Sequence, residues 1–226
     1  MPDTPFPLSP GFCTLLDAGT LAPEAGWPAI TKRAEDLLLG ALLLLLFALP
    51  MLLLALAVRL DSPGPVLFRQ TRVGRGGSLF AMLKFRTMRH QPGEGDALEQ
   101  AVRADRRVTR LGALLRRTSL DELPQLLNVL RGEMSLVGPR PHAPATRAAG
   151  RLFHEVVPSY AARHRIRPGM TGLAQVRGFR GETDTEEKLV WRVESDLEYI
   201  ENWSLGRDLL IILRTALAVL LMRNAY

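Results

Sequence analysis

The chain has 226 residues, with 29 Lys and Arg against 23 Asp and Glu, four His and a single Cys. That length suits one domain, or one domain with an anchor, and one cysteine excludes both a disulfide framework and a cysteine-based zinc cluster. With 47% hydrophobic and 23% charged residues, the composition is that of a folded chain and not of a disordered one.

The net charge of +6 conceals two oppositely charged segments. Residues 59–117 hold 13 basic and 5 acidic residues, a local charge of +8, whereas residues 181–208 hold 9 acidic and 3 basic residues, a local charge of −6. A basic segment suits an anionic partner such as nucleic acid, a phospholipid surface or a nucleotide, although a solvated basic face has the same composition.

The first predicted elements are a leader and an apolar helix. Residues 1–30 are rich in proline and carry no basic residue, which predicts a loosely packed leader. Leu37–Val58 contains no charged residue, and as a helix it would span about 33 Å, enough for a hydrocarbon core of about 30 Å. It has no polar stripe, and its late start and length exclude a cleavable signal peptide. We therefore predict insertion into a membrane.

The topology of this helix depends on Pro50, which divides it into arms of 13 and eight residues and predicts a bend. A kinked helix can still cross a bilayer. Basic residues mark the cytoplasmic side, and they lie on both flanks, at Lys32 and Arg33 and again from Arg59 onward. This favours a re-entrant helix, whereas the acidic neighbours Glu35 and Asp36 and a leader without basic residues favour a crossing one. The residues alone leave both topologies open.

A β-hairpin is predicted next. Val66–Val73 is rich in strand-forming residues, Gly74–Gly77 supplies a turn and Ser78–Met88 resumes the pattern. Lys84 and Arg86, two residues apart, would share one face of the second strand. Because neighbouring cations repel, we expect an anion between them.

The strongest catalytic candidates are the adjacent carboxylates Asp121 and Glu122. Ser119-x-x-Glu122 has the form of a capping box, and leucines at helical spacing follow it up to Gly132, a predicted helix stop. An arbitrary Asp-Glu pair more often only stabilises the positive end of a helix. Here, however, basic residues cluster nearby in the sequence, at Arg106, Arg107, Arg110, Arg116 and Arg117. A helix N-terminus is also a natural phosphate site, and an ionised carboxylate there could attack phosphorus with a divalent ion beside it.

The C-terminal half is predicted to be partly helical. The sequence Gly138-Pro139-Arg140-Pro141 predicts an extended segment that presents Arg140 rigidly. Residues 185–203 read as an acidic amphipathic helix. Residues 205–222 are apolar but carry three charges, which is typical of a helix in the membrane interface, with a core helix as the alternative. The sequence has no phosphate loop, no His-Glu-x-x-His and no Gly-x-Ser-x-Gly motif.

Taken together, these stretches resemble the bacterial sugar transferases, membrane-bound polyprenyl-phosphate phosphoglycosyl transferases that start glycan assembly on a lipid carrier. The similarity runs in the same order over about residues 31–226. The matching stretches are SPGPVLFRQTRVG (62–74), KFRTM (84–88), RRTSLDELPQLLNVLRGEMSLVGPRP (116–141), RPGMTGLAQVRG (167–178), GETDTEEK (181–188), DLEYIENWSL (196–205) and the final NAY (224–226).

The resemblance implies a mainly helical α+β fold with a small β-hairpin. It implies a re-entrant membrane helix over residues 31–60, bent at Pro50, and a cytosolic catalytic domain over residues 61–226 that ends in C-terminal interfacial helices. The expected location is the cytosolic face of the bacterial inner membrane, in contact with its lipids. Many relatives carry four further spanning helices before this domain, and we expect this chain to resemble the short members that lack them.

The resemblance also implies an activity, the transfer of hexose-1-phosphate from a UDP-sugar to undecaprenyl phosphate with release of UMP, as the first membrane step of exopolysaccharide or capsule synthesis. In this ping-pong reaction Asp121 would form a phosphosugar–enzyme intermediate, Glu122 would assist, and the pair would place Mg²⁺. The residues expected to contact phosphates or the nucleotide are Lys84, Arg86, Arg116, Arg117, Arg140 and Arg167. The C-terminal stretches resemble members that use UDP-glucose or UDP-galactose.

Two other classes of function stay open. A membrane-tethered nucleic-acid-binding protein could use the basic segment 59–117, but that segment has few aromatic residues and no known reading element, so we expect no nucleic acid. A single-span protein could scaffold other glycan enzymes. The sequence decides neither between the two hexoses nor whether the chain forms a homo-oligomer.

Overall fold

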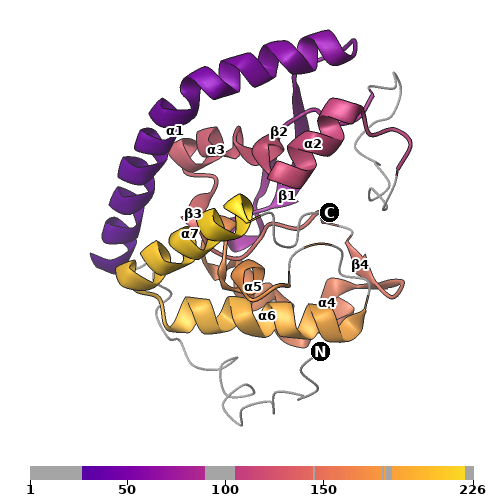
Figure 1. Cartoon of the computed structure of the whole chain (residues 1–226). Coiled ribbons are helices and arrows are strands. Elements are labelled where there is room, and N and C mark those ends of the chain that lie inside the picture. The colour runs from indigo at the N-terminus through magenta and orange to yellow at the C-terminus, as the bar shows by residue number, and fades with distance from the viewer. Residues whose placement is uncertain (1–26, 90–104, 145, 180, 182–184, 222–226) are drawn as a thin grey trace.

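The computed structural model describes residues 27–89, 105–144, 146–179, 181 and 185–221 (Figure 1). Most of the predicted leader and the final NAY stretch lie outside these residues. The described part is mainly helical with small sheets, which confirms the predicted α+β class. Its elements in chain order are α1 (Trp27–Asp61), β1 (Leu67–Val73), η2 (Arg75–Gly77), β2 (Leu79–Phe85), α2 (Arg110–Thr118), η3 (Leu120–Glu122), α3 (Gln125–Arg131), β3 (Ser135–Val137), β4 (Arg147–Ala148), β5 (Arg151–Leu152), α4 (Phe153–Val156), η4 (Pro158–Arg165), β6 (Gly169–Thr171), α5 (Leu173–Val176), α6 (Glu186–Glu201) and α7 (Leu205–Leu220).

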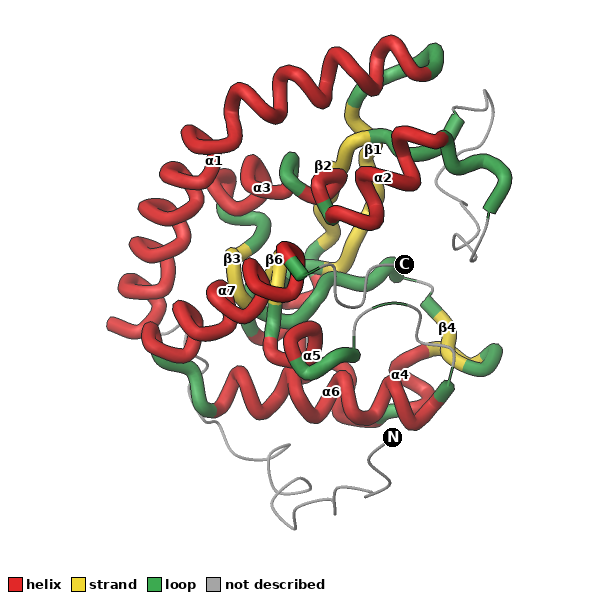
Figure 2. The backbone as a smooth tube through the Cα atoms, viewed as in Figure 1, coloured by secondary structure: helices red, strands yellow, loops and turns green. Residues whose placement is uncertain are grey.

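The sheets among the described residues have two strands each (Figure 2). β1 and β2 form the predicted antiparallel hairpin, in which Leu67 pairs with Phe85 at one end and Val73 with Leu79 at the other. Its turn contains Gly76 at a φ of 62°, a conformation that glycine adopts without strain. β3 pairs with β6 in parallel, and β4 pairs with β5 antiparallel.

α1 is a bent helix that lies along one side of the protein (Figures 1 and 2). It begins at Trp27, inside the predicted leader, and contains Pro50, which removes a backbone donor and accounts for a bend. The arm before Pro50 packs against the main core and the arm after it packs against a second cluster that includes Phe85 and Leu115. The contacting residues are Leu39, Leu43 and Leu44 in the first arm, and Met51, Leu54, Ala55 and Val58 in the second.

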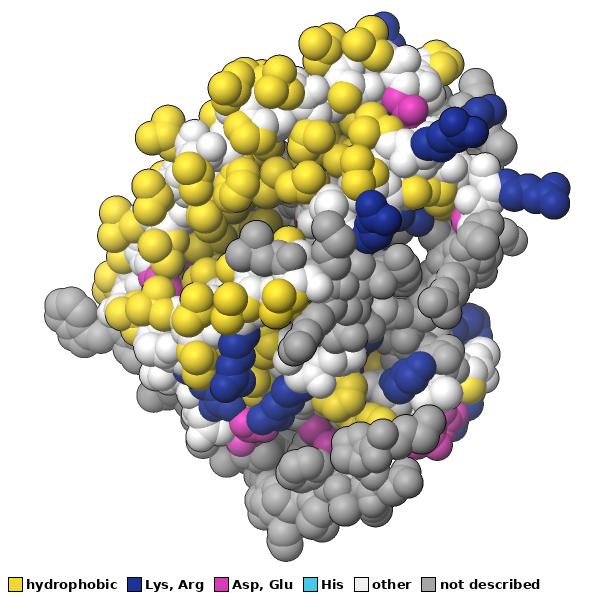
Figure 3. All heavy atoms as spheres, in the orientation of Figure 1, with side chains coloured by type: hydrophobic (Ala, Val, Ile, Leu, Met, Phe, Trp, Pro, Cys, Tyr) yellow, Lys and Arg dark blue, Asp and Glu magenta, His cyan; other side chains and the backbone are white. Residues whose placement is uncertain are grey.

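The opposite side of α1 is apolar and exposed. Among the described residues α1 is the helix long and apolar enough to span a membrane, and its outward leucines reach 77% exposure at Leu45. Figure 3 shows hydrophobic side chains gathered over α1 and α7 on one face of the molecule. On α7 the exposed leucines are Leu205, Leu209, Leu210, Leu213 and Leu217.

The polar start of α1 is anchored inside the protein. Lys32 Nζ lies 2.7 Å from Asp208 Oδ2 of α7 and 3.2 Å from Asp36 Oδ1. Arg33 donates hydrogen bonds of 2.7 and 2.8 Å to the carbonyl oxygens of Val129 and Leu130, which satisfies carbonyls at the end of α3. The two basic residues that precede the apolar stretch therefore bind protein groups, so their value as markers of the cytoplasmic side is reduced.

The main core lies between α3, β3, α6 and α7. Leu126 and Val129 of α3, Val137 of β3, Val193 of α6 and Ile211 of α7 are among its buried members. The predicted helix of residues 185–203 is confirmed as α6, and the side chain of its N-cap residue Thr185 accepts a hydrogen bond from the Lys188 N–H. The core thus connects the hairpin and α3 to the C-terminal helices.

The predicted capping box at Ser119 is wrong. Ser119 adopts a left-handed conformation, with φ 59° and ψ 15°, ends α2 and makes no side-chain capping bond to the next turn. Residues Leu120–Glu122 form a 3-10 turn, and α3 starts only after Pro124, because a proline without an N–H is tolerated at the start of a helix and not inside it. Gly132, at φ 85°, ends α3 as predicted.

Candidate active site

The hairpin brings Lys84 to the carboxylate pair. Lys84 Nζ on β2 lies 3.0 Å from Glu122 Oε1. Asn128 of α3 fixes this arrangement, because its side chain accepts a hydrogen bond of 3.0 Å from the Leu83 N–H and donates one of 2.8 Å to the Ala81 carbonyl. Asn128 therefore pairs with the outer edge of β2, so the turn that precedes α3 meets the strand at a fixed position.

Arg140 approaches Glu122 from the extended segment that follows β3. Its guanidinium donates to both carboxylate oxygens of Glu122, with an Nη1–Oε2 distance of 3.2 Å and a shorter Nη2–Oε1 contact. This is the two-point arginine–carboxylate geometry, which fixes orientation as well as charge. The segment passes very close to β6, since a Cβ at Gly169 would lie 2.1 Å from the Gly138 nitrogen. Only glycine fits there, and Arg140 is held in place by that approach.

Arg116 reaches the site from α2. A Cβ at Gly112 would lie 2.0 Å from the Thr87 carbonyl oxygen, so glycine is needed for α2 to pack this closely. Arg116 Nε then donates a hydrogen bond of 2.8 Å to Thr87 Oγ1, and its charge acts on Asp121. The neighbouring Arg117 is exposed on α2.

The two carboxylates differ in their surroundings. Glu122 is engaged by Lys84 and Arg140, whereas no side chain among the described residues donates a hydrogen bond to the carboxylate of Asp121, which is only 7% exposed. Burial raises the pKa of Asp121 to about 6, against the lowering effect of Lys84. At neutral pH most of Asp121 is ionised, buried and uncommitted, which is the condition of a carboxylate nucleophile.

Arg86 takes a different position from the one expected. Its guanidinium donates to the carbonyl oxygens of Val58, at 3.1 Å, and Ser62, at 2.6 Å. β2 ends at Phe85, but the Arg86 N–H still donates a hydrogen bond to the Val66 carbonyl oxygen, so it is the Arg86 side chain, bound to the Val58 and Ser62 carbonyls, that departs from the expectation. Arg86 therefore binds backbone carbonyls at and just after the end of α1. This position does not support the expected anion between Lys84 and Arg86.

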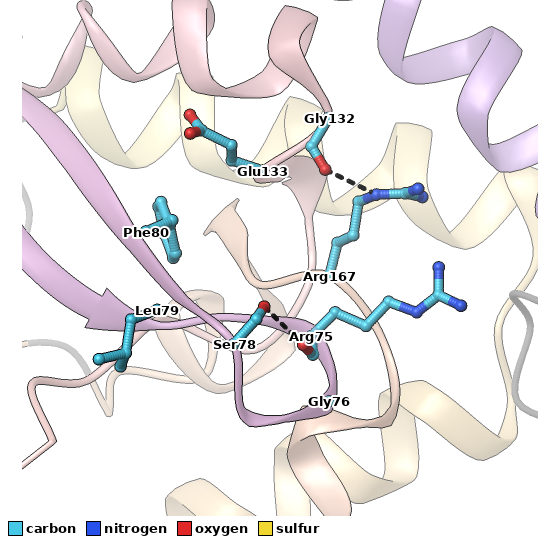
Figure 4. Close-up of a pocket in the computed structure, with 8 residues that line it drawn as sticks. All are labelled: Arg75, Gly76, Ser78, Leu79, Phe80, Gly132, Glu133 and Arg167. Carbon is cyan, nitrogen blue, oxygen red and sulfur yellow. Dashed lines mark hydrogen bonds between the residues drawn. The ribbon is translucent and has the colours of Figure 1, made fainter.

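Arg167 lies at a pocket farther along the hairpin (Figure 4). The pocket has a volume of about 450 Å³ and is lined in part by Arg75, Phe80 and Glu133. Arg167 Nε donates a hydrogen bond of 2.9 Å to the Gly132 carbonyl. Arg167 therefore lines this pocket together with Phe80 of β2 and Glu133.

The carboxylate pair could supply part of the ligand set of a magnesium ion. Within the described ranges, no group of three or more His, Cys, Asp or Glu could hold a metal ion. Mg²⁺ is often bound by one or two carboxylates together with substrate phosphates, and Asp121 and Glu122 fit that smaller donor set. Asp121 would be the better metal ligand of the two, because the carboxylate of Glu122 already forms ion pairs with Lys84 and Arg140.

Arg72 is a further basic residue near the carboxylate pair that was not among the predicted site residues. It lies in the RQTRVG stretch on β1 and pairs across the hairpin with Phe80, while Phe68 pairs with Lys84. Paired residues and those two apart share one face of a sheet, so Arg72 and Lys84 point to the same side. That alternation was readable in the sequence and could have placed Arg72 on the face of Lys84, whereas its interaction with Arg140 and Glu122 is seen only in the folded structure.

The sequence of this chain matches a family model and several characterised proteins. A family model described as "Bacterial sugar transferase" matches residues 27–222. A relative from Caulobacter vibrioides, "UDP-glucose:undecaprenyl-phosphate glucose-1-phosphate transferase", is 52% identical over 228 residues, which cover 99% of this chain and 82% of the relative. A protein of the same name from Escherichia coli K12 is 48% identical over 90% of this chain and 43% of its own length. The "Exopolysaccharide production protein PSS" of Rhizobium leguminosarum is 51% identical over 84% of this chain and 96% of its own length.

Proposed function

The chain belongs to the bacterial sugar transferase family, and we propose that it is a phosphoglycosyl transferase that moves glucose-1-phosphate from UDP-glucose to undecaprenyl phosphate in exopolysaccharide synthesis. The name of the Caulobacter relative, which matches 99% of this chain, supports the activity, and the name of the Rhizobium relative supports a role in exopolysaccharide production. The sequence alone does not decide between glucose and galactose, and the names of the Caulobacter and E. coli relatives favour glucose. The chain spans most of the Caulobacter and Rhizobium relatives and less than half of the one from E. coli.

Asp121 is the nucleophile in this proposal. The observation that carries the assignment is the contrast within the pair, since Glu122 is bound by Lys84 and Arg140 while Asp121 accepts no hydrogen bond from a described side chain. An oxygen of Asp121 attacks the β-phosphorus of UDP-glucose, and the bond from that phosphorus to the bridging oxygen breaks. UMP leaves with the electron pair. A phosphate oxygen of undecaprenyl phosphate then attacks the same phosphorus and releases the Asp121 carboxylate.

The surrounding cations make the attack of an anion on an anion feasible. Lys84, Arg116 and Arg140 all act electrostatically on Asp121, and they would stabilise the charge that builds on the phosphoryl oxygens. Glu122 would hold Lys84 and Arg140 in position. Mg²⁺, when bound by one or both carboxylates and by substrate phosphates, supplies further charge neutralisation.

The apolar helix and the lipid acceptor indicate association with a membrane. We further propose that α1 is re-entrant and that the catalytic part lies on the cytosolic face of the bacterial inner membrane. Both arms of α1 pack against the rest of the folded chain, the first through Leu43 on the main core and the second through Val58 on the second cluster, which supports this topology. In a helix that crosses a bilayer, one arm would lose its contacts with the rest of the folded chain. The exposed leucines of α7 extend the apolar face and suit a helix at the interface.

The activity is tested by incubating the membrane-embedded protein with undecaprenyl phosphate and a panel of UDP-sugars and measuring UMP. We expect UMP and a lipid-linked diphosphate sugar with UDP-glucose, and much less with UDP-galactose and UDP-N-acetylated sugars. If no UDP-sugar yields UMP, the proposed activity is wrong. If UDP-galactose is the better donor, only the sugar assignment is wrong.

A further inference from the structure

Arg72 carries a buried polar atom that its protein surroundings do not explain. It lies on β1, opposite Phe80, and its Nη2 donates a hydrogen bond of 2.5 Å to Gln70 Oε1. Its Nε is buried and finds no hydrogen-bond partner among the described residues. Buried polar groups in folded proteins are almost always paired, so an unpaired one calls for an explanation.

The environment of Arg72 is the candidate active site. Its guanidinium interacts electrostatically with Arg140 and Glu122, and burial together with the charge of Arg140 lowers its pKa to about 10. Arg72 therefore keeps its charge at neutral pH while standing near another cation. Glu122 does not resolve this repulsion, because it already accepts hydrogen bonds from Lys84 and Arg140.

The charges around the pair are unbalanced. Two carboxylates face four cations, so the site carries two excess positive charges when both carboxylates are ionised. The cations are Lys84, Arg72, Arg116 and Arg140, and the carboxylates are Asp121 and Glu122. Like charges held together in a partly buried site cost free energy unless an anion joins them, and the planar fork of arginine matches phosphate oxygens.

We propose that Arg72 is a substrate-binding residue that donates its unpaired Nε–H to a phosphate oxygen at the transfer site. This inference rests on the proposed function, and it adds to that function a residue from the strand opposite Lys84. Both substrates carry the required group, the donor as a diphosphate and the acceptor as a monophosphate. The experiment below separates the two.

The test compares Arg72→Met and Arg72→Lys with a matched control on the same strand. Arg69 is exposed and pairs with Leu83, so it points to the opposite face of the hairpin, and Arg69→Met removes the same charge nearby. For each variant the KM values for UDP-glucose and for undecaprenyl phosphate are measured separately, with kcat, the thermal midpoint and inhibition by inorganic pyrophosphate.

We expect Arg72→Met to raise one KM about tenfold or more, the effect of losing a charge-assisted hydrogen bond. Inhibition by pyrophosphate should weaken in parallel. Arg72→Lys, which keeps the charge without the fork, should fall between Arg72→Met and the wild type, and Arg69→Met should stay within about twofold of the wild type. A rise confined to UDP-glucose places Arg72 on the donor, and a rise confined to undecaprenyl phosphate places it on the acceptor.

Two results would overturn the inference. One is wild-type KM values in a folded Arg72→Met enzyme. The other is a fall in thermal midpoint and kcat with both KM values unchanged in Arg72→Lys, which would make Arg72 purely structural. Either result leaves the proposed function intact, because that function fails only if the wild-type protein releases no UMP.

Discussion

The guanidinium of Arg163 donates a hydrogen bond of 2.8 Å to the backbone carbonyl oxygen of Arg140. Arg163 is itself buried and is held by Asp196 of α6, with an Nη2–Oδ2 distance of 2.5 Å and an Nε–Oδ2 distance of 3.1 Å. Its Nη1 also lies 2.6 Å from His142 Nδ1. A buried ion pair thus fixes the backbone of the residue whose side chain engages Glu122.

Breaking this ion pair should destabilise the protein strongly. Asp196→Asn leaves the Arg163 charge buried without its counter-charge, a change that costs about 3–5 kcal/mol. For a chain of this size that corresponds to a fall in thermal midpoint of about 6 °C or more, with reduced activity at temperatures below the midpoint. Glu198→Gln on the same helix is the control, since Glu198 forms partly exposed pairs with Arg177 and Arg207 and should cost about 1 kcal/mol or less. Equal shifts for the two variants would contradict this account.

Replacing the proposed nucleophile should stop the first half-reaction. We expect Asp121→Asn to lower UMP release in the absence of lipid acceptor by at least about 10³-fold, because the amide cannot form the phosphosugar adduct. Intact-protein mass spectrometry of the wild type after quenching should show the adduct, and the variant should show none. Glu122→Gln should slow the adduct without abolishing it. Wild-type release of UMP by Asp121→Asn would remove Asp121 from this role.

The raised pKa of Asp121 predicts a pH dependence of activity. The carboxylate must be ionised to attack, and its pKa is raised to about 6, chiefly by burial. The rate of UMP release without acceptor should therefore fall on the acidic side of about pH 6, by about tenfold for each further pH unit. A rate that stays constant down to pH 5 would show that Asp121 titrates near its ordinary value.

The same pKa predicts that Asp121 reduces stability at neutral pH. A carboxyl group whose pKa is higher in the folded state than in the unfolded state favours the folded state at low pH, and this contribution is lost as pH rises from about 4 to about 6. The shift from 3.8 to about 6 corresponds to a cost on the order of 2–3 kcal/mol above pH 6. Asp121→Asn should raise the thermal midpoint at pH 7.5 and raise it much less at pH 5. A gain of equal size at both pH values would point to another cause.

The topology of α1 can be tested with the chain's single cysteine, Cys13. A re-entrant helix places the segment before α1 on the side of the catalytic domain, so an impermeant thiol reagent added outside intact cells should leave Cys13 unlabelled. Permeabilised cells provide the positive control. In Pro50→Ala the two arms of α1 can align, and we expect external labelling to increase. Labelling of wild-type Cys13 from outside would contradict the re-entrant topology, and an unchanged Pro50→Ala would show that the proline does not determine it.

Local sequence signals predicted the elements of this fold well. The uncharged run at Leu37–Val58, the strand pattern on either side of Gly74–Gly77 and the stop at Gly132 each describe interactions between near neighbours in the chain, and each was confirmed as a helix, a hairpin or a helix end. The capping box at Ser119 failed because the residue took a left-handed conformation at the end of α2, which a four-residue motif does not encode.

The sequence by itself determined the apolar helix, the family and the carboxylate pair, because these depend on composition, periodicity and motif. Only the tertiary structure decided that Lys84 and Arg140 engage Glu122 and leave Asp121 uncommitted, that Arg86 binds the end of α1, and that Arg72 faces the site. Such contacts join groups far apart in the chain, and long, flexible basic side chains can reach several partners from one backbone position. Their choice is fixed by the packing of the elements that carry them, so it is a property of the folded chain.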